Sequence, residues 1–341
     1  MTTYIGMDAH SKTCVFVAVN SKGRELAAVR VNTSESEILK FIRQLPGKKS
    51  LAVEECHITQ WVYRLLNSEV DRFTAFNAAR ISRKKGPQDD FIDARNIAHQ
   101  LRGNFLESVF HEDTDLSELR TVLSAYRDVV RDGTRLKNRY KAIFRSNAIE
   151  TSGKTPYTDE TLVDRLSRTC DKFVAKTMFD QLATYKKVKA LYDAELAKSA
   201  SKLPVINLLS TVPGISTVRA STIASVVCSP ERFENKNKFW SYAMLVRHNQ
   251  VSDGVVYCRA NVTARADLKE VFMGAAQTVI QGESELRSFY DEQRKAGKDH
   301  KAAKKNLARK IAAICLSVMR NNISFNNNYD GRDLKSQHRI N

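Results

Sequence analysis

The chain has 341 residues, of which 42% are hydrophobic, and this length allows two or three domains with buried cores. Its 55 Lys and Arg against 38 Asp and Glu give a formal net charge of +17 at pH 7. A balance this basic indicates a polyanionic partner, either a nucleic acid or a membrane surface. The sequence has no apolar run that could span a bilayer, no signal-peptide layout and no clear membrane-binding amphipathic helix. The expected partner is therefore a nucleic acid and not a membrane.

Six cysteines are scattered along the chain, and none forms a Cys-x-x-Cys pair. This spacing argues against a zinc ribbon and against a disulfide scaffold. Reduced thiols in a cytoplasm are the expected state.

The N-terminal residues predict three strands joined by short turns. Residues 3–8 form an apolar strand that ends in Asp8, residues 13–20 form a second strand rich in Val and Phe, and residues 25–31 form a third. Strands so close in sequence predict an antiparallel meander.

Helices and strands then alternate. Thr33 or Ser34 caps a helix that Pro46-Gly47 ends, and residues 51–54 form a fourth strand that ends in Glu54. The following elements are a helix over about residues 59–66, a strand over 73–76, a basic segment over 78–85 and, after Gly86-Pro87, a helix that begins near Asp90.

The order β-β-β-α-β-α-β-α is that of the ribonuclease-H fold, in which the first strand lies beside the fourth. Asp8 and Glu54 would then end neighbouring strands. Asp90 and Asp93 are three residues apart, so they share one face of the last helix. Acids at strand ends are commonly solvated, and the helix dipole alone favours acids in a first turn. Four acids in this order on these elements favour a shared site instead.

Carboxylate oxygens are hard ligands suited to Mg²⁺. We therefore predict a magnesium site at Asp8, Glu54, Asp90 and Asp93, the layout of RuvC-type nucleases and of many transposases. One or two metal ions there can polarise a phosphodiester and stabilise the attacking and leaving oxygens.

Residues 116–148 keep apolar side chains at a three-four spacing with basic residues between them, and Gly133 is expected to interrupt this helix. Helical patterns resume around residues 162–166 and over 178–196. The pattern predicts a helical hairpin or coiled coil whose apolar stripe is either an intramolecular seam or a dimer seam. Its basic face either contacts a nucleic-acid backbone or is simply solvated.

The last part of the chain begins with Val212-Pro213-Gly214-Ile215, which joins two predicted helices. This segment resembles a helix-hairpin-helix, which presents backbone N–H groups to phosphate, but an ordinary helical corner is an equal alternative. Ser252-Asp253-Gly254 predicts a turn. Helices are expected over about 268–280 and 301–319, followed by a polar, Asn-rich and mobile tail.

Together these segments resemble insertion-sequence family 110, the DEDD-type transposases, a group that includes Piv DNA invertases and bridge-RNA-guided recombinases. The resemblance runs from Tyr4 to about Met319. The matching segments are Ile5-Gly6-Met7-Asp8-Ala9-His10-Ser11-Lys12, Ala52-Val53-Glu54, Asp90-Phe91-Ile92-Asp93-Ala94-Arg95-Asn96-Ile97-Ala98, Val212-Pro213-Gly214-Ile215 and Tyr242-Ala243-Met244-Leu245.

The resemblance implies an α/β plus α plan. Residues 1–108 would form a RuvC-like DEDD domain, 109–202 a helical coiled-coil insertion, 203–322 a mostly α C-terminal transposase domain with the helix-hairpin-helix-like segment, and 323–341 a flexible tail.

The resemblance also implies catalytic residues. Carried over, the four acids hold Mg²⁺, and Ser252 is the nucleophile that forms a covalent bond to a DNA phosphate. A serine hydroxyl needs activation, which a metal ion held by carboxylates can support. Because Ser252 and the acids lie in different domains, the chain would fold over or share its active site between protomers, which favours a homodimer or homotetramer.

The implied function is a DNA transposase or recombinase of a mobile element, cytoplasmic and nucleoid-associated when active, with double-stranded donor and target DNA as partners. The resemblance leaves open whether a structured guide RNA takes part. One alternative is a site-specific DNA invertase of the Piv type. Alternatives from another class are a nucleic-acid-binding protein with an inactive site and a junction nuclease that forms no covalent intermediate.

The chain departs from the family pattern at three places. Glu55-Cys56-His57 replaces the usual small residue, Thr and Gly after Glu54, so Glu55 is a rival ligand, although the strand phase favours Glu54. Asp253 separates Ser252 from Gly254. The family's Ser-Lys-x-Gly segment is not visible, and Ala264-Arg265-Ala266-Asp267 stands in that region.

Overall fold

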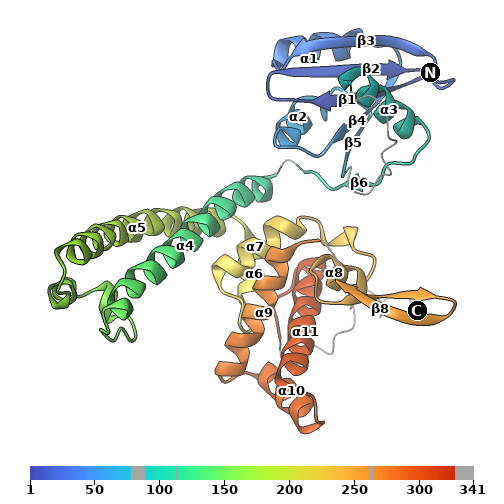
Figure 1. Ribbon diagram of the computed structural model, residues 1–341. Coiled ribbons are helices and arrows are strands. Elements are labelled where there is room, and N and C mark those ends of the chain that lie inside the picture. Colours follow the sequence, from blue (N-terminus) through green and yellow to red (C-terminus); the bar gives the residue numbers. More distant parts are fainter. Residues whose placement is uncertain (78–88, 113, 262–263, 327–341) are drawn as a thin grey trace. The chain divides into compact units, whose positions relative to one another are not determined.

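The computed structural model describes residues 1–77, 89–112, 114–261 and 264–326 of the chain (Figure 1). Its contacts divide it into two compact units, Met1–Asp113 and Thr114–Asn341. The predicted basic segment 78–85 and most of the predicted tail lie outside the described residues.

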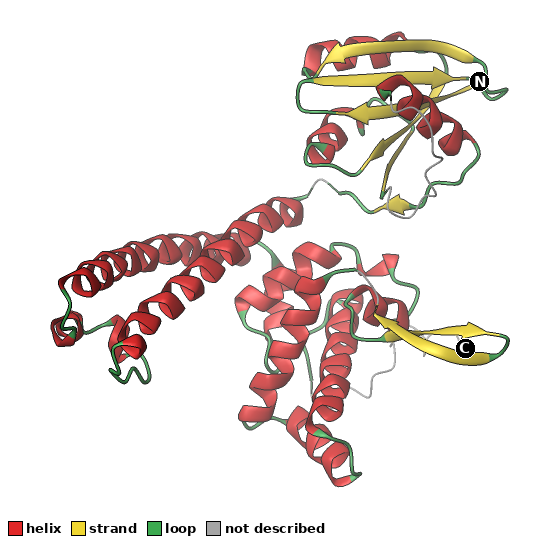
Figure 2. Cartoon of the chain, viewed as in Figure 1, coloured by secondary structure: helices red, strands yellow, loops and turns green. Residues whose placement is uncertain are grey.

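Within the described residues of the first unit, six strands form one mixed sheet in the order β3-β2-β1-β4-β5-β6 (Figure 2). The strands are β1 (Thr2–Ala9), β2 (Thr13–Val19), β3 (Glu25–Asn32), β4 (Lys48–Glu54), β5 (Arg72–Phe76) and β6 (Ser108–Val109). The helices are α1 (Glu35–Gln44), α2 (Thr59–Leu66) and α3 (Asp90–Arg102). The predicted order of elements is confirmed, and β1 pairs in parallel with β4. The short strand β6 was not predicted.

The two faces of the sheet carry different helices. Ile5, Met7, Leu51 and Val53 belong to the core under α1 and α2, because alternate residues of a strand point to opposite faces. The opposite face packs against α3 through two smaller clusters, which include Val15, Val17, Ala52, Ala94, Ala98, Ile97 and Leu101.

Gly6 sets how closely α3 approaches β1. A Cβ atom at Gly6 would lie 2.0 Å from the carbonyl oxygen of Ala94 and 2.5 Å from the backbone nitrogen of Ala98. A side chain at this position would push the helix away from the sheet. Since Asp8 lies two residues after Gly6 and Asp90 lies one turn before Ala94, this contact also brings the two acids together.

The second unit begins with two long helices that lie side by side, α4 (Asp115–Ser146) and α5 (Thr169–Ser201) (Figure 1). Its other elements are α6 (Pro204–Ser210), α7 (Thr217–Val227), α8 (Lys236–Tyr242), β7 (Arg247–Ser252), β8 (Val255–Asn261), α9 (Ala266–Gln281), α10 (Glu285–Lys295) and α11 (His300–Asn321). Helix α10 was not predicted. Across the described ranges, no helix combines the length and the apolar character needed to cross a bilayer.

The helical pair shares a core with the rest of this unit at one end. Leu119 and Leu123 of α4 and Leu196 of α5 are buried in the cluster that α6, α7, α9 and α11 form. At the other end, Tyr140 and Phe144 of α4 pack in a separate cluster that includes Leu182 of α5. The apolar stripe of α4 is thus covered within the chain, and the three-domain division stays a prediction.

The prediction that Gly133 interrupts the helix is wrong, because α4 continues through it. A Cβ atom at Gly133 would lie 2.2 Å from ring carbons of Tyr185 on α5. The same ring lies under Lys137, whose Nζ is 5.1 Å from the ring centroid. Gly133 is therefore the place where an aromatic ring packs directly on the backbone of the neighbouring helix.

Gly133→Ala is expected to lower the free energy of unfolding by about 1–3 kcal/mol, because the added methyl group displaces Tyr185. Helix propensity alone gives the opposite sign, since alanine is favoured over glycine by about 1 kcal/mol. Urea denaturation followed by circular dichroism measures the difference. In a Tyr185→Ala background the same substitution is expected to lose its penalty, and stabilisation of the wild-type background would contradict the packing.

Asp267 links α4 to α9. Its Oδ2 accepts hydrogen bonds from Arg127 at 3.0 Å and from Arg265 at 2.6 Å, and its side chain is 11% exposed. Burial acts to raise the pKa of Asp267, but the hydrogen bonds and charges of Arg265 and Arg127 outweigh burial and lower this pKa to about 2. The ionised carboxylate therefore stabilises the folded chain.

Asp267→Asn is expected to reduce the free energy of unfolding at pH 7 by roughly 2 kcal/mol. A lowered pKa stabilises the fold above the unfolded value near 4, so the difference from wild type shrinks as the pH falls from about 4 towards 2. Urea denaturation at pH 7, 5, 4 and 3 measures it. Asp128→Asn, which removes an exposed partner of Arg131, is a control expected to change stability by less than about 0.5 kcal/mol.

Candidate active site

Asp8 and Glu54 lie at the ends of neighbouring parallel strands: Asp8 is the penultimate residue of β1 and Glu54 is the last residue of β4. Met7 pairs with Val53 in the β1–β4 register, so the two acids follow in step. Ala52, two residues before Glu54, packs in the cluster with α3, so the alternation of the strand directs Glu54 to the same face as Asp8.

The side chain of Glu55, which follows β4, is directed away from the face that α3 covers. Its backbone N–H donates to the carbonyl of Phe76, and its carboxylate Oε1 is 3.9 Å from Nε2 of His111. Glu55 is therefore oriented towards β5 and β6, which favours Glu54 as the acid that faces α3.

The acids of α3 lie in its first turn. Asp89 caps the helix and accepts a hydrogen bond from the backbone N–H of Phe91 at 3.1 Å. Asp90 and Asp93 follow, and their charges both act on Asp8. The first turn of α3 thus lies over the end of β1.

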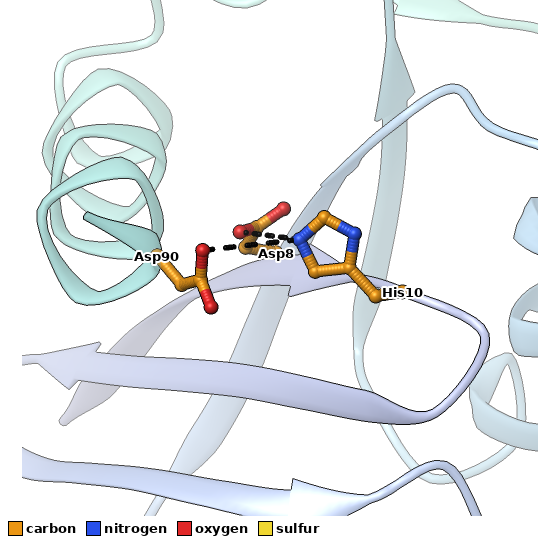
Figure 3. A group of neighbouring side chains, drawn as sticks. All are labelled: Asp8, His10 and Asp90. Carbon is orange, nitrogen blue, oxygen red and sulfur yellow. Dashed lines mark hydrogen bonds and ion pairs between the residues drawn. The ribbon is translucent and has the colours of Figure 1, made fainter. Parts of the chain in front are cut away.

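Three side chains converge at this place (Figure 3). Nε2 of His10 is 3.1 Å from Oδ2 of Asp8 and 4.0 Å from Oδ1 of Asp90. Ligand atoms of these three residues all lie within 4.8 Å of one another. Sequence reasoning did not select His10 as a site residue, although it stands two positions after Asp8 in the quoted motif.

The electrostatics of Asp8 reflect this crowding. Burial raises the pKa of Asp8, the charge and hydrogen bond of His10 oppose that rise, and the charges of Asp90 and Asp93 add to it. Carboxylates held this close repel each other, and a cation between them relieves the repulsion.

Arg30 of β3 holds Asp90 from the opposite side. Its Nη2 lies 2.9 Å from Oδ2 of Asp90, and its guanidinium carbon lies 5.6 Å from the centroid of the Phe91 ring. A second pair, Arg95 to Glu25 at 2.9 Å, also joins α3 to β3. Strand β3 therefore fixes the first turn of α3, a role that the sequence pattern did not indicate.

Ser252 is the last residue of β7, at the tip of a two-stranded hairpin. Asp253 and Gly254 both have positive φ, 50° and 74°, the conformation of a tight hairpin turn. The predicted turn is confirmed, and Asp253 occupies a turn position that Asp tolerates. Ser252 is exposed and belongs to the second unit, whereas the four acids belong to the first.

The turn between α6 and α7 is packed against α9. A Cβ atom at Gly214 would lie 2.6 Å from the carbonyl oxygen of Ala275, and Arg219 Nη1 donates to the carbonyl of Gly214 at 2.6 Å. These contacts favour the helical-corner alternative over an open phosphate-binding hairpin.

Two models of known protein families match the chain. A family model of DEDD-type IS110 transposases, described as "Transposase", matches residues 5–147 and spans all four acids. A second, described as "Transposase IS116/IS110/IS902 family", matches residues 206–291 and spans Ser252. The chain is an IS110-family transposase. No curated protein matches it.

This transposase is an enzyme that acts on DNA, and its DEDD type implies a divalent metal. The residues fit such an ion. Carboxylate oxygens from two elements converge, and such oxygens are the ligands that Mg²⁺ prefers. Burial raises the pKa of Asp8, and the charges of Asp90 and Asp93 add to this rise, so a cation at this place would be stabilised.

Proposed function

We propose that this transposase cuts and joins the DNA of a mobile element in a Mg²⁺-dependent reaction with Ser252 as nucleophile. The observation that carries the proposal is the convergence of Asp8 and Asp90 at one end of the sheet, in a chain of the DEDD transposase family.

Asp8, Glu54, Asp90 and Asp93 would hold the metal ion. Mg²⁺ there supplies charge stabilisation for the attacking and leaving oxygens of a phosphodiester. The chain's own residues supply the rigidity: the paired strands β1 and β4 fix Asp8 and Glu54, and the packing of α3 on Gly6 fixes the two aspartates of the helix.

Ser252 would attack the scissile phosphorus with its Oγ. The new Oγ–P bond replaces the bond to the DNA hydroxyl, which leaves with a proton, while the serine proton passes to a base. Attack by the hydroxyl of another strand then reverses these steps and restores the free serine, so strands are joined without an external energy source. The exposed tip of a β-ribbon suits this role, because the major groove of DNA admits a two-stranded ribbon.

Three further assignments belong to this proposal. The strand order and the parallel β1–β4 pair support a RuvC-like, ribonuclease-H fold for the first unit. The placement of Ser252 and the acids in separate units supports a composite site in a homodimer or homotetramer. The net charge of +17 supports a guide RNA as a second polyanion.

The guide is tested by purifying the full chain from cells that carry the flanking DNA of its gene and sequencing the bound RNA. We expect one structured transcript of the flanking non-coding region, and loss of recombination after ribonuclease treatment. Full recombination by the ribonuclease-treated protein would remove the RNA from the proposal without affecting the metal site or Ser252.

A further inference from the structure

Helix α11 carries an unusual distribution of charge. Lys301, Lys304 and Lys305 lie in its first two turns, and the sequence of α11 contains no Asp or Glu. Cations near a helix N-terminus are disfavoured by the helix dipole. Asp299, which caps the helix and accepts from the N–H of Ala302 at 2.9 Å, offsets only part of this effect. These lysines therefore lower the stability of the helix that carries them.

Lys305 belongs to a cluster of cations from three elements. Arg309 lies one turn further along the same face of α11, Arg247 begins β7, and Lys269 lies in the first turns of α9. The charges of Arg309, Arg247 and Lys269 all act on Lys305, and helices α9 and α11 pack against each other. We call these four residues the root cluster.

Arg309 fixes the cluster at the root of the β7–β8 hairpin. Its Nε donates to the carbonyl of Leu245, two residues before Arg247, at 2.9 Å, and its Nη1 donates to Asn306 Oδ1 at 3.2 Å. Both of these acceptors are neutral, so they orient the guanidinium without neutralising its positive charge.

The cations of the root cluster repel one another. Burial lowers the pKa of Lys305, and the charges of Arg309, Arg247 and Lys269 lower it further, while burial lowers the pKa of Arg309. Like charges gathered at one place destabilise the fold unless an anion neutralises them. Arg247 and Lys269 are exposed, so such an anion reaches the cluster from the surface.

We propose that Lys305, Arg309, Arg247 and Lys269 form a binding site for backbone phosphates of duplex DNA at the root of the hairpin that carries Ser252. The inference rests on the proposed function in taking this hairpin as the element that engages DNA. The hairpin extends from the helices of its unit as a two-stranded ribbon (Figure 2).

The ribbon favours DNA over RNA as the ligand. The major groove of B-DNA admits a two-stranded ribbon, whereas the deep, narrow major groove of A-form RNA does not. Ser252 lies five residue positions after Arg247, which is about 17 Å along a strand. That distance matches about five base pairs along the DNA axis. The cluster would hold phosphates at one end of a short duplex segment and the serine would reach the other.

The test measures affinity for a labelled duplex by fluorescence anisotropy over a series of salt concentrations, with full-length Asp93→Asn protein in EDTA so that no strand is cut. The variant pair is Lys305→Gln with Lys269→Gln. The matched control pair is Lys295→Gln with Lys198→Gln, two exposed lysines on α10 and α5. Circular dichroism checks that all proteins remain folded.

We expect the root-cluster pair to lower the slope of log affinity against log salt by about 1.8, since each phosphate contact contributes about 0.9. Affinity near physiological salt should fall on the order of tenfold. The control pair should leave both values close to those of the parent. DNA should also protect Lys305 and Lys269, but not Lys295, from acetylation detected by mass spectrometry.

An unchanged slope in the root-cluster pair, an equal loss in the control pair, or a loss confined to RNA binding would overturn the inference. If the Asp93→Asn parent binds no DNA at all, this result contradicts the proposed function itself, and with it the phosphate site. If the parent binds DNA and the root-cluster pair binds equally well, only the phosphate site is wrong.

Discussion

Asp8→Asn is expected to lower Mg²⁺-dependent strand cleavage by at least about a thousandfold, a barrier increase of roughly 4 kcal/mol. Asp8 lies next to His10 and Asp90, and the charges of Asp90 and Asp93 both act on it, so the substitution removes one of the carboxylates that would hold the metal. Recombination in cells between the element's own ends, and cleavage over a Mg²⁺ titration in vitro, measure the effect.

Stability separates this loss from misfolding. Burial and the charges of Asp90 and Asp93 raise the pKa of Asp8, and a raised carboxyl pKa means that the ionised form destabilises the fold at neutral pH. In EDTA the Asn variant should therefore melt at the same temperature as wild type or higher. Stabilisation by added Mg²⁺ should be seen in wild type and be absent in the variant.

Glu54→Gln and Glu55→Gln are a matched pair for the second ligand. The side chain of Glu54 shares its face with α3, whereas Glu55 is oriented towards His111. We expect Glu54→Gln to lose cleavage and Glu55→Gln to retain it. The reverse result would move the metal site to the other side of the β4 end, and full activity of Asp8→Asn would remove the metal role altogether.

Ser252→Ala is expected to abolish the covalent protein–DNA intermediate and to reduce recombination by at least about a thousandfold, because no other group replaces the nucleophile. A denaturing gel with labelled DNA detects the adduct. Ser288→Ala, which changes another exposed serine on α10, is the control and should leave the adduct unchanged.

Asp253→Asn tests the neighbouring acid. Asp253 has φ of 50° in the turn, and Asn favours this region at least as well as Asp. We expect full activity if Asp253 serves only the turn. Loss of the adduct would instead make Asp253 a participant in the chemistry, and an adduct that persists in Ser252→Ala would place the nucleophile elsewhere.

The elements of the first unit follow from local patterns. Apolar strands and turn residues predicted the order of strands and helices up to α3. The expectation that β1 lies beside β4 came from the ribonuclease-H fold, which has the same order, and this pairing is observed. Strand β6 has two residues and forms only by pairing with β5, so no periodicity could indicate it. Gly133 was misjudged because intrinsic propensity says nothing of the Tyr185 ring that packs on it.

The acids of the candidate site could be predicted from the sequence, but their neighbours could not. Acids at strand ends and in a helix turn are visible in the sequence, and the structure brings Asp8 and Asp90 together. His10 and Arg30 were missed, because their contacts depend on how α3 crosses β1 and β3. The family resemblance singled out Ser252, and Asp253-Gly254 predicted the turn that follows it. Neither pattern predicts how far Ser252 lies from the acids.

The most direct test of a serine transposase with a carboxylate-bound metal is peptide mapping of the protein–DNA adduct. The adduct is formed with Mg²⁺, digested with protease and nuclease, and analysed by mass spectrometry. We predict a nucleotide phosphate attached to Ser252, and no adduct from Asp8→Asn. Attachment to another residue, or cleaved DNA with no protein attached at any stage, would contradict the proposed mechanism.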